Sequence, residues 1–259
     1  MLIAITRAVS PALAECELTH REREPIDVAI AAAEHAVYEA VLRSLGAAIV
    51  RAREEPGLPD AVFVEDAAVV VDEIAVMTNP GAATRRQEVE SVAEILRTYR
   101  PIATIESPDT LDGGDVLRVG RRLYVGMSSR TNAEGAAQLQ ALLDPWSYEV
   151  IPVAVTGCLH LKSAITLVAE GLLLLNPAFV RRECFDGMDT IAVARSEPDA
   201  ANALLIGGAV VFPAHFPETA RYLEHAGIHV VPVPCTQIAK AEGGVTCCSL
   251  LLDAARVSP

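Results

Sequence analysis

Side chains that could take part in nucleophilic catalysis, a pair of thiols and an imidazole, stand at the ends of apolar runs in this sequence. Residues 242–252 read EGGVTCCSLLL, so the adjacent thiols of Cys247 and Cys248 follow two glycines and precede an apolar run. An alternating strand would direct these two thiols to opposite faces, one toward a pocket and one into a core. A thiol in such a place can act as a nucleophile if the chain also supplies a base and an acid.

The candidate base is His160, which lies between two leucines in the motif CLHLKSAIT, where a strand is predicted to start. A single histidine in apolar surroundings is more often a packing residue. The other histidines have helix or loop contexts without such company and are interpreted as surface or packing residues: His20, His35, His215, His225 and His229. His160 is therefore the candidate for general acid/base catalysis.

Carboxylates gather in two further motifs. In LPDAVFVED, Asp60, Glu65 and Asp66 surround a predicted buried strand. In LDGGDVL, Asp112 and Asp115 flank two glycines; taken alone this is an acidic turn, and no Lys-Ser/Thr follows to make it a phosphate loop. Burying several carboxylates is costly unless a cation pairs with them. The two motifs therefore predict a bound guanidinium, held by forked hydrogen bonds.

The elements that must position these groups recur along the chain. An order of strand, turn, strand and helix is predicted in residues 61–99, 113–143 and 201–227, and residues 163–179 repeat the hairpin with an irregular continuation. The spacing of roughly forty to fifty residues is typical of units that bury their apolar faces against neighbours.

A fifth unit requires both ends of the chain. The last apolar strand, residues 248–252, has no partner nearby in sequence. Residues 1–8 and 47–50 are predicted strands, and a helix between them starts at Asp27 and ends at Gly46. The pattern favours five units closed into a ring over a plain α/β sandwich with hairpins. No linker divides the chain, so we expect one domain spanning residues 1–259.

Composition narrows the class of partner. The chain has 259 residues, 51% hydrophobic, and a formal net charge of −13, which argues against nucleic acid and agrees with a cationic small substrate. The same acidity also favours solubility.

Six cysteines without a CxxC motif or a zinc-type Cys/His spacing indicate free thiols in a reducing cytoplasm. Four of them are interpreted as packing residues: Cys16, Cys158, Cys184 and Cys235. No apolar run is long enough to span a membrane, and the N-terminus is interpreted as a strand, not a signal peptide.

Together, the motifs FVED, LDGGDVL, His-Leu-Lys-Ser and GGVTCCS resemble those of the dimethylarginine dimethylaminohydrolases, in the guanidine-modifying pentein superfamily. The resemblance extends over about residues 18–252. It implies a five-bladed α/β propeller of ββαβ units with pseudo-fivefold symmetry, which agrees with the repeats.

The resemblance also implies roles for single residues. Cys247 would be the nucleophile, His160 the general acid/base, and Asp112 the acid of the triad, where some members carry Glu. The implied substrate-binding residues are Leu18 in a lid segment, Asp60, Glu65 and Asp66 around the guanidinium, Arg85 and Arg130 at the substrate α-carboxylate, and Glu242 at the pocket mouth. Some family members have Asp in place of Glu242. An arginine before a helix is usually solvated, so only the motif context indicates a role for the two arginines.

The activity implied by the resemblance is hydrolysis of asymmetric dimethylarginine or monomethylarginine to citrulline and methylamines through a covalent thiouronium on Cys247. No metal or organic cofactor is required. Two alternatives stay open: an arginine or agmatine deiminase-type enzyme, and a non-catalytic pentein-fold binding protein. The exact guanidine, the pathway, the oligomeric state, including a homodimer, and any redox role of Cys248 or Cys184 stay open as well.

Overall fold

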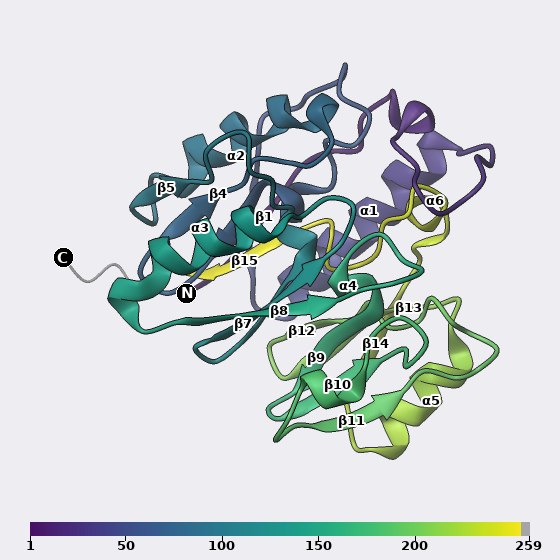
Figure 1. Ribbon diagram of the computed structural model, residues 1–259. Coiled ribbons are helices and arrows are strands. Elements are labelled where there is room, and N and C mark those ends of the chain that lie inside the picture. The colour runs from purple at the N-terminus through teal and green to yellow at the C-terminus, as the bar shows by residue number, and fades with distance from the viewer. Residues whose placement is uncertain (255–259) are drawn as a thin grey trace.

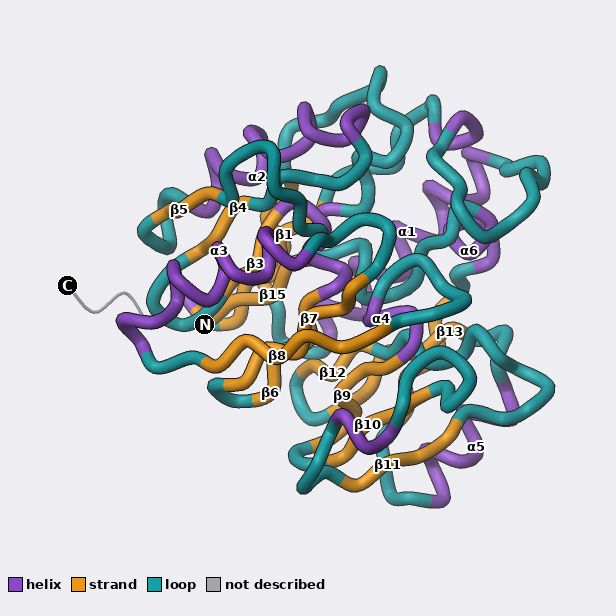
Figure 2. The backbone as a smooth tube through the Cα atoms, viewed as in Figure 1, coloured by secondary structure: helices purple, strands orange, loops and turns teal. Residues whose placement is uncertain are grey.

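A computed structural model describes residues 1–254 of the chain (Figure 1). Its strands form five three-stranded sheets, and each sheet combines an antiparallel pair of strands with a parallel third strand. In Figure 2 the longer helices lie nearer the outside of the molecule, and the strands β5 (Ile102–Thr104) and β11 (Asp189–Ala192) also lie at its edge. The predicted order of strand, turn, strand and helix is thereby confirmed.

Four units follow one another along the chain. The first comprises β3 (Ala68–Val70), β4 (Ala75–Met77), η3 (Ala83–Glu88), α2 (Val89–Leu96) and β5 (Ile102–Thr104). The second comprises β6 (Val116–Val119), β7 (Arg122–Met127), α3 (Ala133–Leu143), η5 (Asp144–Trp146) and β8 (Glu149–Ala154). The third comprises β9 (Ile165–Ala169), β10 (Leu172–Leu175), the short η6 (Arg182–Cys184) and β11 (Asp189–Ala192). The fourth comprises β12 (Leu204–Ile206), β13 (Ala209–Pro213), α5 (Pro217–His225) and β14 (Val230–Val233).

The fifth unit joins the two ends of the chain, as predicted. It comprises β15 (Leu250–Asp253), β1 (Leu2–Thr6), α1 (Val28–Ser44) and β2 (Ala48–Arg51). β15 pairs antiparallel with β1, with Ile5 opposite Leu250, and β1 pairs parallel with β2. The Asp27 side chain caps α1 by accepting the amide hydrogen of Ile30. The two termini therefore supply one blade together.

Apolar cores lie between neighbouring sheets, which is what closes the ring. Alternate residues of one strand enter different cores: Val116 packs with β4 and β7, whereas Leu117 packs with β9 and β10. The last core joins β13 of the fourth unit to β1 of the fifth. Strands buried on both faces need near-continuous apolar sequences, which explains runs such as LLLL at residues 172–175.

The segments that lead into the first strand of each unit differ from the prediction. Residues 64–67 form the 3-10 turn η2 (Val64–Ala67) instead of a strand, and His160 precedes the short helix α4 (Leu161–Ala164). The cysteine pair lies in a turn before β15, which starts at Leu250. A strand would point the consecutive side chains of Glu65 and Asp66 to opposite faces, whereas a tight turn lets both enter one site.

The remaining short elements are η1 (Leu13–Glu15), η4 (Gly113–Asp115) and α6 (Thr236–Lys240). Across residues 1–254, no helix combines the length and the apolarity that crossing a bilayer requires.

Candidate active site

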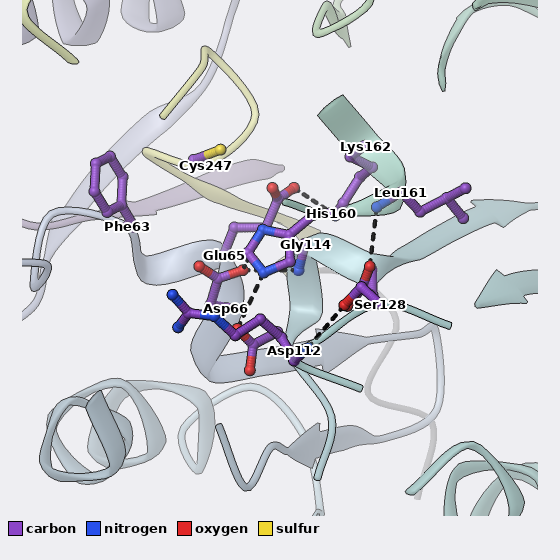
Figure 3. Close-up of polar contacts among 12 residues, drawn as sticks. Phe63, Glu65, Asp66, Asp112, Gly114, Ser128, His160, Leu161, Lys162 and Cys247 are labelled. Atoms are coloured by element: carbon purple, nitrogen blue, oxygen red, sulfur yellow. Dashed lines mark hydrogen bonds and ion pairs between the residues drawn. The ribbon is translucent and has the colours of Figure 1, made fainter. Parts of the chain in front are cut away.

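The site is built from equivalent places in the five units. Just before β3, β6, β9, β12 and β15 lie Asp66, Asp112, His160, Asn202 and Cys247. In a ring of units, equivalent positions meet at the centre. Figure 3 shows the His160 ring close to the carboxylates of Asp66 and Asp112, with Cys247 on a neighbouring loop. Sequence analysis identified four of these residues and missed Asn202, whose motif carries no titratable group.

His160 and Asp112 form the acid–imidazole pair of the site. His160 Nε2 lies 3.0 Å from Asp112 Oδ2, and His160 Nδ1 lies 3.9 Å from Asp66 Oδ1. Burial alone lowers the pKa of His160, but Asp66, the bond to Asp112 and the charge of Asp115 outweigh it and raise the pKa to about 9. His160 is therefore an imidazolium at neutral pH and can donate a proton.

These groups could also hold a metal, because Asp66, Asp112 and His160 offer ligand atoms within 4.8 Å of one another. Each of the three already has a protein partner: Asp112 binds the imidazole, and Asp66 binds Arg85 Nη1 at 2.5 Å. Hydrogen bonding within the protein thus accounts for the cluster, and we interpret it as part of a proton-transfer site.

The two glycines of LDGGDVL allow the acids and the imidazole to meet. A Cβ on Gly114 would lie 2.6 Å from both His160 Nδ1 and Asp66 Oδ1, and one on Gly113 would lie 2.0 Å from the Glu65 carbonyl oxygen. Neither glycine is in the left-handed region. The motif is therefore a close-approach site, and its interpretation as an acidic turn was incomplete.

The buried carboxylate of Asp115 holds the backbone next to both His160 and Asp112. It accepts hydrogen bonds from Ser128 Oγ (2.6 Å), Thr131 Oγ1 (2.7 Å) and the Leu161 amide (2.9 Å). Thr131 Oγ1 in turn accepts the amide hydrogen of Asp112 at 3.1 Å. Burial raises the pKa of Asp115 to about 6. Asp115 thus fixes both members of the acid–imidazole pair, a role that the sequence motif did not reveal.

The loop that carries Cys247 is tied to the segment after His160. Asn202 Oδ1 accepts the Thr246 amide hydrogen at 3.0 Å, and Asn202 Nδ2 donates to the Lys162 carbonyl oxygen at 3.0 Å. Glu65 accepts from Lys162 Nζ at 2.5 Å and from Thr246 Oγ1 at 2.8 Å. Burial raises the pKa of Glu65, and Lys162 opposes this. These bonds fix the position of the thiol relative to the imidazole.

The two thiols differ in burial, although they lie in a turn and not on the alternating strand that the sequence predicted. Cys247 is half-buried and its Sγ accepts the Gly244 amide hydrogen at 3.3 Å, whereas Cys248 is buried in an apolar core. Burial, Glu65 and Asp66 raise the pKa of Cys247 to about 12. At neutral pH the site thus combines a neutral thiol with an imidazolium, because Lys162 lowers the pKa of the thiol by less than burial and the two acids raise it.

The two predicted carboxylate-binding arginines differ. Arg85 is 4% exposed and its guanidinium binds Asp66, Glu88 at 2.8 Å, and the carbonyl oxygens of Asp60 and Phe63. These bonds occupy the guanidinium group of Arg85. Its contact with the substrate carboxylate therefore stays a prediction, and that contact requires these hydrogen bonds to rearrange.

Arg130 has a free donor. Its Nη2 donates to Thr19 Oγ1 at 3.3 Å, while its buried Nη1 has no hydrogen-bond partner among residues 1–254. A buried guanidinium donor without an acceptor is costly. Arg130 is therefore suited to receive an anionic group of a ligand.

Carboxylates also hold the segment around Leu18. Leu18 packs against the same apolar cluster as Cys247. Asp60 Oδ2 accepts the Glu17 amide hydrogen at 3.1 Å, and Glu242 accepts the amide hydrogens of the residues after Leu18. Substrate contacts of Leu18, Asp60 and Glu242 stay predictions.

We predict that Gly114→Ala lowers the pKa of His160 from about 9 toward its ordinary value of 6.5. The added methyl group must displace the imidazole from Asp66 and Asp112, and so weakens the charges that raise this pKa. The measurement is a nuclear magnetic resonance pH titration of the imidazole. Gly57→Ala, where a Cβ meets nothing within 4 Å, is the matched control. An unchanged His160 titration in Gly114→Ala contradicts the close-approach role.

We predict that His160 stabilises the folded protein in a pH-dependent way. Its folded-state pKa, about 9, lies above the ordinary 6.5, so the contribution is complete below pH 6.5 and is lost as pH rises through about 9. The difference in unfolding free energy between wild type and His160→Gln should shrink by on the order of 3 kcal/mol over that range. Urea unfolding at a series of pH values measures it. A difference that is constant or grows with pH contradicts the charged imidazolium.

Comparison with known proteins agrees with this geometry. The family model described as "N,N dimethylarginine dimethylhydrolase, eukaryotic" matches residues 15–185. The N(G),N(G)-dimethylarginine dimethylaminohydrolase of Streptomyces coelicolor is 37% identical over 251 residues, which cover 96% of each chain. The enzyme of that name from Pseudomonas aeruginosa is 34% identical over 86% of this chain and 89% of its own.

Solved structures give the same result. A Pseudomonas aeruginosa dimethylarginine dimethylaminohydrolase mutant, complexed with citrulline, has a TM-score of 0.92 and 32% identity over 96% of this chain and 98% of its own. The N-terminal domain of the cyanobacterial arginine dihydrolase ArgZ has a TM-score of 0.87 at 19% identity, covering 97% of each chain, and shows the shared fold. The chain belongs to the dimethylarginine dimethylaminohydrolase family and has the pentein fold.

Proposed function

We propose that this protein hydrolyses Nω-methylated arginines to citrulline and methylamines. The observation that carries the proposal is the meeting of the Cys247 thiol, the His160–Asp112 pair and the buried acids Glu65 and Asp66 at the ring centre. The relatives that share this name, and the related structure complexed with citrulline, support the same reaction.

A guanidinium substrate adds the positive charge that would ionise the thiol. The carboxylates that raise the pKa of Cys247 would be neutralised by a cation placed between them and the sulfur. The thiol then ionises at lower pH, and its proton passes to solvent. Because the carboxylates keep the guanidinium protonated, its central carbon stays electrophilic while the thiolate forms beside it.

In the first half-reaction, the Cys247 thiolate forms a bond with the central guanidinium carbon. The bond from that carbon to the methylated nitrogen breaks, and the His160 imidazolium gives its proton to the departing amine. Asp112 orients the ring and stabilises its charge. The product of this step is a covalent thiouronium on Cys247 and a free methylamine.

In the second half-reaction, neutral His160 takes a proton from water as the oxygen attacks the thiouronium carbon. The carbon–sulfur bond then breaks, and the sulfur leaves as a thiolate. The remaining hydroxyl proton passes to the thiolate and restores the neutral thiol, while the carbon retains the oxygen as a carbonyl group, which makes citrulline. His160 ends the cycle protonated, as the pKa of about 9 requires.

The unpaired Nη1 of Arg130 favours a substrate with an α-carboxylate. Agmatine has no such group and would leave this buried donor without an acceptor. The likeness to ArgZ, at 19% identity, concerns the fold and gives no support to arginine as the substrate.

Three further features belong to the proposal. The whole chain would act as a single catalytic domain, supported by cores that continue from each unit to the next. A cytoplasmic location would keep the free thiols reduced. A homodimer remains compatible with the fold.

We predict that Cys247→Ser lowers citrulline release from asymmetric dimethylarginine by about a thousandfold or more, because the covalent step is lost. Cys248→Ser is the matched control, since the neighbouring thiol is buried outside the site, and it should retain turnover. Arginine and agmatine are assayed in parallel. Full turnover by Cys247→Ser contradicts the mechanism, and turnover of arginine or agmatine alone contradicts the proposed substrate.

We predict that Arg130→Gln raises KM for asymmetric dimethylarginine by roughly tenfold to a hundredfold, with a smaller change in kcat. A hydrogen bond to a charged group contributes about 1.5–3 kcal/mol, and this one would lie far from the reacting carbon. Steady-state kinetics measure it, with the surface variant Arg121→Gln as the control. An unchanged KM in Arg130→Gln contradicts the carboxylate contact.

A further inference from the structure

The Glu242 carboxylate is occupied by backbone amides of a segment far away in the sequence. It accepts backbone amide hydrogens from three consecutive residues: Thr19 at 3.0 Å, His20 at 2.6 Å and Arg21 at 2.5 Å. Glu242 also has a φ of 57°, a left-handed conformation that non-glycine residues seldom adopt. The chain thus accepts an unfavourable backbone conformation at the residue that binds this segment.

The segment held by Glu242 contacts two of the predicted substrate-binding residues, since Thr19 Oγ1 accepts from Arg130 and the Glu17 amide donates to Asp60. Leu18, directly before the three amides, packs against the same apolar cluster as Cys247. On the other side of Leu18, the Glu17 amide is held by Asp60. Leu18 is therefore fixed between two carboxylates, and we call residues 17–21 the lid.

Side chains make the other hydrogen bonds to the lid: Thr84 Oγ1 donates to Glu17 Oε1 at 2.8 Å, and Arg130 Nη2 donates to Thr19 Oγ1 at 3.3 Å. Within residues 1–254, the amides of residues 17–26 make no backbone–backbone hydrogen bond. The ion pair of Arg21 with Asp199 is largely exposed and contributes little. His20, Arg21 and Glu242 also line a cavity of about 560 Å³. Because the contact borders empty space, it can break without opening the packed core.

Glu242 also connects the lid to the nucleophile. The next residues are Gly243 and Gly244, and the Gly244 amide donates to Cys247 Sγ. A Cβ on Gly243 would lie 2.4 Å from the Phe63 ring, and one on Gly244 would lie 2.4 Å from Asn202 Oδ1, so this loop is closely packed. The acceptor of the lid amides is thus a fixed part of the site.

We propose that Glu242 is a positioning residue that latches the lid over a bound guanidine substrate. It acts through the lid amides and does not touch the reacting atoms. The inference rests on the proposed function for the identity of the substrate, and it assigns to Glu242 a role other than the direct substrate contact predicted from the sequence.

The test compares Glu242→Gln with wild type. Glutamine keeps the size of the side chain, but it loses the charge and places a donor where one lid amide donates. Hydrogen–deuterium exchange of the amides of Thr19, His20 and Arg21 should become about tenfold faster or more. KM for asymmetric dimethylarginine should rise by a similar factor, with a smaller change in kcat. Glu242→Asp, which keeps the charge on a shorter side chain, should lie between the two.

Asp199→Asn is the matched control, because it removes the exposed ion pair of the same lid and should change neither quantity. Wild type alone gives a second check: the amides of residues 19–21 should exchange more slowly than those of residues 22–24. Unchanged exchange in Glu242→Gln, equal exchange across residues 19–24, or a loss of kcat with the amides still protected overturns the proposal. Amide exchange needs no turnover, so failure of the proposed function is distinguishable from failure of the latch.

Discussion

The structure depends on burying several carboxylates at one point. Asp66, Asp112 and Asp115 are almost inaccessible to solvent, and Glu65 is 6% exposed. Such a group of charges is stable only with cations and hydrogen-bond donors around it. Arg85, Lys162 and the His160 imidazolium supply part of that charge. The protein folds with these partners in place and leaves the site suited to one further cation.

This constraint explains the local backbone. Tight turns bring consecutive acids into one site, and glycines without a Cβ let the imidazole and the acids approach. It also explains the chemistry of the unliganded site, in which the thiol is neutral and the imidazole is charged. In the proposed mechanism, a guanidinium substrate completes the charge balance and lowers the pKa of the thiol that attacks it. Selectivity for cations and activation of the thiol thus have one electrostatic cause.

The sequence predicts the ring because local patterns determine it. Apolar runs separated by turn residues define the hairpins, and the unpaired run at residues 248–252 requires the N-terminal strand. Strong chemical types also make Cys247, His160 and Asp112 candidates for catalysis through the resemblance to the family. Asn202 and Asp115 are different: their roles depend on contacts with Thr246, Lys162 and Leu161, which lie 40 to 46 residues away in the sequence. The burial of Arg85 against Asp66 likewise depends on tertiary packing that no local motif records.

The central claim is that a bound cation ionises Cys247. The most direct measurement is the ultraviolet absorbance of the thiolate as a function of pH, taken as the difference between wild type and Cys247→Ser. It is recorded without ligand and with a saturating amidine analogue of the substrate that carries a carbon chain in place of the leaving amine. The account predicts a thiol pKa far above neutral in the free protein, falling by about two units or more when the cation binds. A thiol already ionised at neutral pH without ligand, or a pKa that the cation does not move, would contradict it.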